Sequence, residues 1–310
     1  MVSSFIPKSF LQGPPQKAVV HQIDFTKTTP PIPAFKNDFA AVIDNFMTES
    51  ECTELLHLAE QSTNPTSDQT PVWERAMINS GGGKEVMSVD SRKSGRIIFD
   101  SPDIAQRILD RLMPFMKEFN IDRVHDMPAV TGLGPARRGE TFHLSGLNER
   151  LRFLRYEGGD YFRPHWDGRY VRPDGKEGSL FTIHLYLNGE GEQDMEELLP
   201  EIERAEKKNA LFVKGGEVDL MDVGNESELE DGSGSGTSAR VAADSNKEKL
   251  LGGATSFTDD YRAREVVRVF PKTGSILIFQ QRHLMHCGDD VFRGVKYTVR
   301  SDIMYTNESA

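Results

Sequence analysis

Apolar positions recur along this chain with two different periods. Residues 39–46 alternate apolar side chains built from Phe, Ala, Val and Ile, which predicts a strand. Residues 102–119 instead place apolar side chains three and four positions apart, which predicts a helix with one core-facing stripe. That stripe comprises Ile104, Ile108, Leu109, Leu112, Met113 and Met116. The pattern predicts strands that form the core and helices that pack on them.

Two further helices are indicated by local signals. Thr48 is followed three residues later by Glu51, the spacing of a capping box, so we expect a helix from there to about Ser62. Residues 194–208 are rich in charge and predict a surface helix, interrupted at Pro200.

Composition divides the chain into an arm, one domain and an insertion. Residues 1–37 are rich in Pro and Lys and are expected to form an extended arm before a domain over residues 38–306. Residues 190–251 are expected to be an insertion: the charged helix, then an acidic Gly/Ser-rich segment that cannot bury enough apolar surface to order itself.

The tripeptide His165-Trp166-Asp167 is the main candidate for chemistry. Side chains alternate along a strand, so His165 and Asp167 would lie on the same side of it. Two histidines and one carboxylate form the triad that leaves open positions on non-haem Fe(II). We expect His286 to supply the third ligand from a distant strand, with His283 as the alternative.

A cationic strand begins ten residues after His286. Lys296 and Arg300 are four residues apart, so they share one face of that strand. An anionic co-substrate that chelates iron needs a fixed positive charge at its far end, and either residue could supply it. Arg300 could instead meet an anionic substrate.

Several segments, in this order and spacing, resemble the 2-oxoglutarate/Fe(II)-dependent oxygenases, in the prolyl 4-hydroxylase-like branch. The resemblance covers roughly residues 38–306 and depends on the order of its parts more than on any one of them. These parts are the segment Phe39 to Ser62, Tyr156-x-x-Gly159-x-x-Phe162-x-x-His165-x-Asp167, residues 252–257, Pro271-x-x-Gly274-Ser275 and His286-x9-Lys296.

The resemblance implies a double-stranded β-helix, or jelly roll, flanked by helices: a mostly β fold of the α+β kind. It implies iron held by His165, Asp167 and His286. Lys296 and Tyr186 are then expected at the distal carboxylate of 2-oxoglutarate. Further expectations are Tyr156 near the co-substrate or the substrate, His184 lining the pocket beside Tyr186, and residues 63–93 as a mobile loop over the site, with Trp73 either facing the substrate or docking the loop.

The implied activity is hydroxylation of a C–H bond, with O2 as the other co-substrate and with release of succinate and CO2. A prolyl residue of a peptide or protein is the natural candidate substrate, a small molecule is the alternative, and ascorbate is the expected reductant. Two other functions stay open: a cupin-like metal enzyme that uses no 2-oxoglutarate, and a non-catalytic binding module. The first would not need Lys296 or Arg300, and the second should have lost a metal ligand.

Charge limits the choice of partner. Asp and Glu outnumber Lys and Arg by 48 to 37, giving a net charge of −11, so we expect no nucleic-acid partner. Arginines nevertheless crowd around the first half of the motif, and they are either solvated rim residues or the mouth of a pocket for an acidic or phosphorylated substrate. They are Arg152, Arg155, Arg163, Arg169 and Arg172.

Cysteine usage and hydropathy bear on the compartment. Cys52 and Cys287 do not make a disulfide framework, and Cys287 should point away from the metal if His286 points toward it. We expect neither a signal peptide nor a membrane span, and we therefore expect a cytoplasmic or nuclear location. The oligomeric state is not predicted by these patterns.

Overall fold

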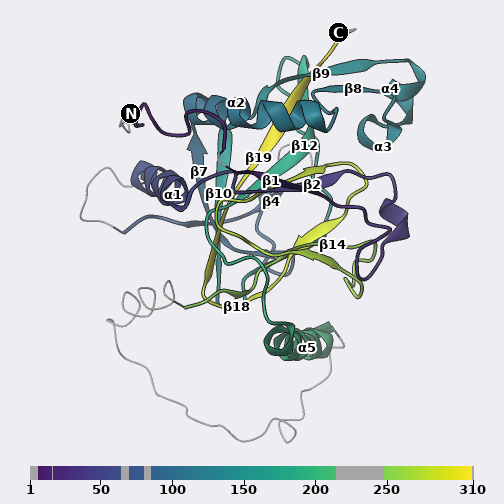
Figure 1. The fold of residues 1–310 in the computed structure, drawn as a ribbon. Coiled ribbons are helices and arrows are strands. Elements are labelled where there is room, and N and C mark those ends of the chain that lie inside the picture. Colours follow the sequence, from purple (N-terminus) through teal and green to yellow (C-terminus); the bar gives the residue numbers. More distant parts are fainter. Residues whose placement is uncertain (1–5, 16, 64–69, 80–84, 214–247, 309–310) are drawn as a thin grey trace, which may run out of the picture.

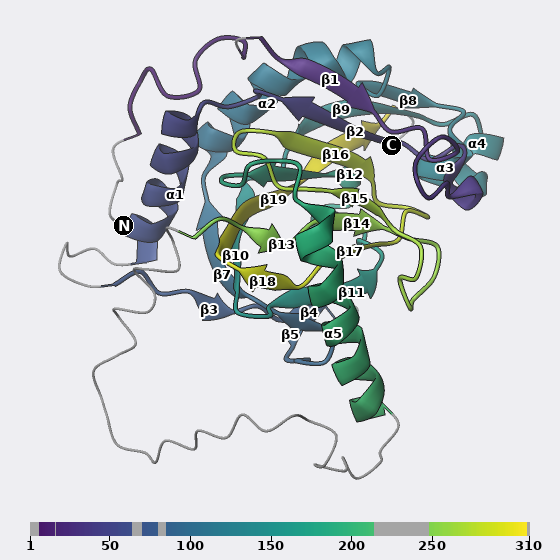
Figure 2. The same ribbon diagram turned by 60° about the horizontal axis from the view of Figure 1, so that its bottom comes forward.

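Two antiparallel sheets face each other as the layers of a jelly roll (Figures 1 and 2). The computed structural model describes residues 6–15, 17–63, 70–79, 85–213 and 248–308. The larger sheet runs in the order β1 (Val19–Gln22), β2 (Ala40–Asp44), β16 (Ile276–Gln280), β12 (Glu177–Tyr186), β19 (Val295–Asn307), β10 (Arg150–Glu157), β7 (Gly95–Asp100) and β3 (Glu74–Arg75), and β9 (Thr141–Leu147) joins β19 to β8 (Arg123–His125).

The smaller sheet carries two of the candidate metal ligands. Its order is β15 (Val267–Val269), β14 (Thr255–Phe257), β17 (His286–Gly288), β11 (Tyr161–His165) and β6 (Arg92–Lys93). Two small two-stranded sheets complete the strands: β13 (Leu251–Gly252) with β18 (Val291–Arg293), and β4 (Ile78–Asn79) with β5 (Glu85–Val86). The predicted mostly β fold with flanking helices is confirmed.

Helices cover the outer face of the larger sheet (Figure 1). α1 (Glu49–Thr63) begins with the predicted capping box, because the Glu51 amide donates to Thr48 Oγ1 and the Thr48 amide donates to Glu51 Oε2. α2 (Pro102–Glu118) buries most of its predicted stripe against the sheet. The remaining helices are the 3-10 turn η1 (Pro33–Phe35), α3 (Pro128–Thr131), α4 (Leu133–Arg137) and α5 (Met195–Val213).

Period-two alternation in the three central strands separates core from site. Odd-numbered residues of β12 and β19, such as Ile183 and Val299, join the apolar cluster under the helices. Even-numbered residues face the interior of the barrel, and the registers place Tyr156 opposite Lys296 and His184 opposite Arg300. The same alternation of side chains along these strands therefore places apolar residues in the main core and polar residues on the floor of the site.

Two expectations about the flanking segments are corrected. The arm over residues 1–37 is not free where it is described: β1 pairs with β2, and Phe25 and Phe35 are buried in an apolar cluster. Its polar composition hid these few anchoring aromatics. The charged helix is not interrupted at Pro200 but runs through it to Val213.

The loop expected over residues 63–93 is partly strand where it is described. Residues 64–69, 80–84 and 214–247 lie outside the described residues, so most of the expected acidic Gly/Ser-rich segment lies outside them too. Trp73 does not face a substrate: its ring lies 5.7 Å from that of Tyr297, and its Nε1 donates to Glu60 on α1. Its role as a docking contact is confirmed. Among the described helices, none is long and apolar enough to span a membrane.

Candidate metal centre

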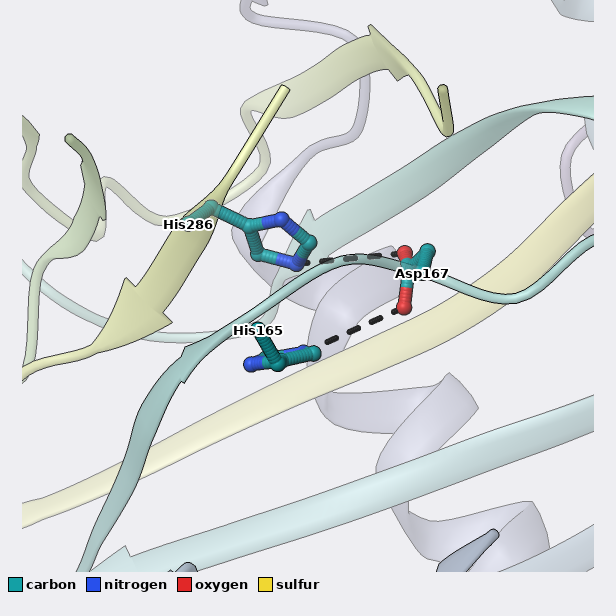
Figure 3. Close-up of side chains that lie close together, drawn as sticks. All are labelled: His165, Asp167 and His286. Carbon is teal, nitrogen blue, oxygen red and sulfur yellow. Dashed lines mark ion pairs between the residues drawn. The ribbon is translucent and has the colours of Figure 1, made fainter. Parts of the chain in front are cut away.

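Antiparallel pairing brings the three predicted ligands together (Figure 3). His165 at the end of β11 is the direct cross-strand partner of His286 at the start of β17. Asp167 follows two residues after His165, and its two oxygens lie 3.9 Å from His165 Nε2 and 3.8 Å from His286 Nε2. One ligand atom from each residue falls within 4.8 Å of the others, which is the spacing of donors around one ion.

Both histidines are oriented by their own strands. His165 Nδ1 lies 2.8 Å from the Arg163 carbonyl oxygen, and His286 Nδ1 lies 3.2 Å from that of Leu284. A proton on each Nδ1 would leave the Nε2 lone pair facing the other ligands, as metal-binding histidines require. Burial lowers the pKa of His165 to about 3 and also lowers that of His286, so both rings are neutral at pH 7.

Asp167 is held as a carboxylate by two different partners. Arg300 Nη2 lies 2.9 Å from its Oδ1, and Thr182 donates to its Oδ2 at 2.7 Å. Burial alone would raise the pKa of Asp167, but the Arg300 guanidinium and the hydrogen bond from Thr182 hold it well below its usual range. The donor set, two neutral imidazoles and one ionised carboxylate, therefore fits Fe(II).

The two candidate cations of β19 differ sharply. Arg300 is already neutralised, because the same Nη2 that meets Asp167 also lies 3.1 Å from Asp302 Oδ1. Lys296 is 3% exposed and forms no hydrogen bond or ion pair with a described residue. Burial lowers its pKa to about 8.

Aromatic rings surround the Lys296 ammonium. Its Nζ lies 5.3 Å from the ring centre of Tyr156 and 5.6 Å from that of Tyr186, and Tyr186 donates to Thr255 Oγ1. Gly253 leaves room for the lysine stem, because a Cβ there would lie 3.3 Å from Lys296 Cδ. The structure thus brings Lys296, Tyr186 and Tyr156 together as one buried group. Asp289, which pairs with Arg268, attracts the ammonium electrostatically, but the ammonium forms no ion pair with a described residue.

His184 belongs to the floor of the same site. It follows Thr182 and precedes Tyr186 on the inward face of β12, and its ring centre lies 6.2 Å from that of His286. Its buried Nδ1 has no hydrogen-bonding partner among the described residues. The expectation that His184 lines the pocket agrees with this position.

Four of the five arginines predicted around the motif are paired with carboxylates. Arg152 meets Asp302 at 3.1 Å, and Arg163 meets Asp290 at 2.7 Å. Arg155 pairs with Glu157, and Arg172 pairs with both Glu149 and Glu177. Arg169 alone of the five has no ion pair with a described residue.

Several residues of the centre were not predicted. Thr182 and Asp302 support Asp167 and Arg300, and Phe162 stacks on the His165 ring with centres 3.6 Å apart. Arg92 from β6 lies over the other side of Phe162. Thr182 and Asp302 carried a usable signal, since each lies two residues from a predicted pocket residue on the same strand face.

Two remaining assignments are settled by position. His283 is exposed and lies outside the ligand cluster, so the alternative third ligand is wrong. Cys287 is buried, with its Sγ 3.6 Å from the Ser256 carbonyl oxygen, and burial raises its pKa well above the usual range. It is a core thiol rather than a ligand, as predicted.

Comparisons with known proteins find structures but no related sequence. No family model and no curated protein matches the chain. Similar solved structures include a viral collagen prolyl hydroxylase from Paramecium bursaria Chlorella virus-1 in its 2OG complex (16% identity, 86% of this chain and 96% of that one, TM-score 0.40). Another is a Trichoplax adhaerens prolyl hydroxylase in complex with a hypoxia inducible factor peptide fragment (14% identity, 87% of this chain and 84% of that one, TM-score 0.43). A third is a Pseudomonas putida prolyl-4-hydroxylase (14% identity, 87% of this chain and 95% of that one, TM-score 0.40). Similarity this distant decides nothing about activity or substrate.

Proposed function

We propose that this protein is an Fe(II)- and 2-oxoglutarate-dependent dioxygenase that hydroxylates a C–H bond, with a prolyl residue of a peptide or protein as the candidate substrate. The observation that carries the proposal is the combination of a two-histidine, one-carboxylate cluster with a buried, unpaired ammonium at Lys296. When bound, iron would activate O2, which would oxidise 2-oxoglutarate to succinate and CO2 and the substrate C–H group to C–OH.

The chain's own residues would do four things in this reaction. His165, Asp167 and His286 would hold the metal through Nε2, a carboxylate oxygen and Nε2. Arg300 and Thr182 would fix the carboxylate of Asp167 so that it cannot rotate away.

Lys296 would bind the distal carboxylate of 2-oxoglutarate, and the hydroxyl of Tyr186 would lie in the same buried group. The apolar walls around them would exclude water from the anion, which strengthens its ion pair with the ammonium. Arg300 is less suited to this task, because two carboxylates already share its charge.

The two alternatives account for less of the site. A metal-binding barrel that uses no 2-oxoglutarate has no need of a desolvated lysine without a counter-ion, since such a charge destabilises the free protein. A binding module has no need of three converging ligand atoms with oriented lone pairs. We retain ascorbate as the reductant and a reducing cytoplasmic or nuclear setting as parts of the proposal, because both cysteines are buried free thiols.

The test is succinate formation from 2-oxoglutarate by anaerobically Fe(II)-loaded protein on exposure to O2. The assay is run with and without ascorbate, with a panel of prolyl peptides and metabolites, and with Lys296→Ala and Arg300→Ala. We expect iron-dependent succinate that rises with one panel member. Bound metal without iron-dependent succinate under any condition would reject the proposal in favour of a barrel that does not use 2-oxoglutarate.

A further inference from the structure

A cavity of about 580 Å³ opens beside the metal ligand Asp167. Its volume lies in the range of roughly 300–1,000 Å³ that is usual for small-ligand sites. Its lining includes apolar side chains such as Leu180, the exposed indole of Trp166, uncharged polar side chains and basic ones. The polar side chains are Thr131, Ser179 and Gln281, and the basic ones are Arg169, Arg282 and His283. Apart from Asp167, no acidic residue lines it within the described part of the chain.

The two arginines of this cavity are free of carboxylate partners. Neither the Arg169 nor the Arg282 guanidinium forms a hydrogen bond or ion pair with a described residue. Glu140 is close enough to act on Arg169 electrostatically, but it already binds Arg138 and Asn307. The other four predicted rim arginines are paired with carboxylates, so Arg169 is the unpaired member of that rim, and Arg282 lies with it at the wall of the cavity.

Both guanidinium groups lie against a glycine, but only Gly178 is needed to leave room for one. A Cβ at Gly178 would lie 2.5 Å from Arg169 Nη2, which is closer than a real Cβ contact. A Cβ at Gly132 would lie 3.5 Å from Arg282 Cζ, an ordinary contact distance. Arg169 therefore occupies a place that no larger residue at position 178 would leave open.

We propose that Arg169 and Arg282 form an anion subsite beside the metal, and that the substrate carries a carboxylate close to the group that is hydroxylated. This inference rests on the proposed function and deepens it by naming a substrate class. Asp167 does not cancel the two cations, because Arg300 and the metal would take its charge. Trp166, 48% exposed and edge-to-face with Tyr261 at 5.4 Å, supplies an apolar wall for the rest of an acidic peptide segment.

The experiment is calorimetric titration, without O2, of the full-length protein loaded with Fe(II), using four probes. Three are capped pentapeptides of equal length with a central proline: Ala-Ala-Pro-Ala-Ala, Asp-Ala-Pro-Ala-Asp and Lys-Ala-Pro-Ala-Lys. The fourth is N-acetyl-aspartate, which presents the same carboxylate without a peptide. We expect the acidic peptide to bind about tenfold more tightly than the neutral one, and less tightly as salt rises.

Four variants assign that preference to the cavity. Arg169→Gln and Arg282→Gln should each remove about tenfold in affinity for the acidic peptide, and Arg169→Lys should retain part of it. Arg150→Gln is the matched control, since Arg150 is also exposed but pairs with Asp100 outside the cavity. A circular dichroism spectrum and an unfolding curve for each variant show that the fold is kept.

Each outcome decides the matter. Equal binding of the acidic, neutral and basic peptides, or full acidic preference in both glutamine variants, would overturn the subsite. If N-acetyl-aspartate binds as tightly as the acidic peptide, the subsite is supported and its ligand is a small acid rather than a peptide. Preferential binding of the acidic peptide without iron-dependent succinate would support the subsite and reject the proposed function. Succinate formation stimulated equally by all three peptides would support the proposed function and reject the subsite.

Discussion

Two cationic regions lie near the candidate metal ligands, and they differ in how far their side chains are exposed to solvent. Lys296 is buried, with aromatic rings around it and no counter-ion. Arg169 and Arg282 are exposed at the wall of the neighbouring cavity. A desolvated ammonium gains most from one anion of the right shape, whereas exposed guanidinium groups are screened by salt and favour a class of ligand. The buried region at Lys296 thus suits one co-substrate of fixed structure. The exposed region at Arg169 and Arg282 suits selection among substrates.

The largest effect should come from removing the ligands that both regions adjoin. His165→Ala, Asp167→Ala and His286→Ala should each abolish 2-oxoglutarate turnover in the absence of substrate, because each leaves a coordination position without its donor. Metal content measured after Fe(II) loading and desalting should fall in parallel. His283→Ala is the control and should keep both; near-native turnover in any of the three variants would remove the assignment.

Arg300→Gln tests whether this buried cation belongs to the metal ligand rather than to the co-substrate. It leaves Asp167 and Asp302 without their shared partner, so the free energy of unfolding should fall by about 3 kcal/mol. Denaturant titration measures this loss, and iron affinity should fall with it. A rise in the KM for 2-oxoglutarate at unchanged stability and metal affinity would instead make Arg300 the anchor.

Lys296→Met should have opposite effects on stability and on binding. The free protein should become more stable to heat, because a buried charge without a counter-ion is removed. The Kd for 2-oxoglutarate should rise about 100-fold, since its distal carboxylate loses a buried partner. Lys296→Arg serves as the control that keeps the charge, and a destabilised Lys296→Met protein with unchanged affinity would contradict the assignment.

The Lys296 ammonium also predicts a pH dependence. Its pKa is about 8 in the folded protein, below the value of 10.5 expected when unfolded, so the unfolded chain binds more protons between these two values. Stability should therefore rise between pH 8 and 10.5 relative to Lys296→Met. Affinity for 2-oxoglutarate should fall above pH 8, by up to about tenfold per pH unit. A flat affinity profile from pH 7 to 9.5 would argue against Lys296.

The smallest effect should come from the paired arginines of the rim. Arg172→Gln breaks the pairs with Glu149 and Glu177, which are partly exposed, so unfolding free energy should fall by about 1 kcal/mol or less. The preference for an acidic peptide should be unchanged, since Arg172 does not line the cavity. A loss of that preference in Arg172→Gln would show that rim charge as a whole, rather than the unpaired arginines, selects the ligand.

Much of the centre could be predicted because strand geometry is local. Period-two alternation puts Lys296, Arg300 and Asp302 on one face of β19. The expectation that His165 and Asp167 lie on one strand is corrected, because β11 ends at His165 and Asp167 follows it in irregular structure. What the sequence does not contain is the register between distant strands. The pairing of His165 with His286, and of His184 with Arg300, emerges only when the sheets form.

Long-range partners explain the wrong predictions as well. The segment over residues 1–37 looks polar, yet β1 extends the larger sheet and two phenylalanines are buried beneath it. For Trp73 the sequence left two roles open, and its contacts with Glu60 of α1 and with Tyr297 show the docking role. Likewise, the rim arginines look alike in sequence, and only their carboxylate neighbours separate the paired ones from Arg169.

The position of β19 in the chain has a consequence for biosynthesis. This strand follows every other described strand in sequence, yet it lies at the centre of the larger sheet between β10 and β12. During translation β10 and β12 leave the ribosome before β19, so the two strands cannot be joined in one sheet until β19 has been synthesised. A nascent chain that stops short of residue 295 would contain all three metal ligands but neither Lys296 nor Arg300. Assembly of the site is thereby delayed until almost the whole domain has been made.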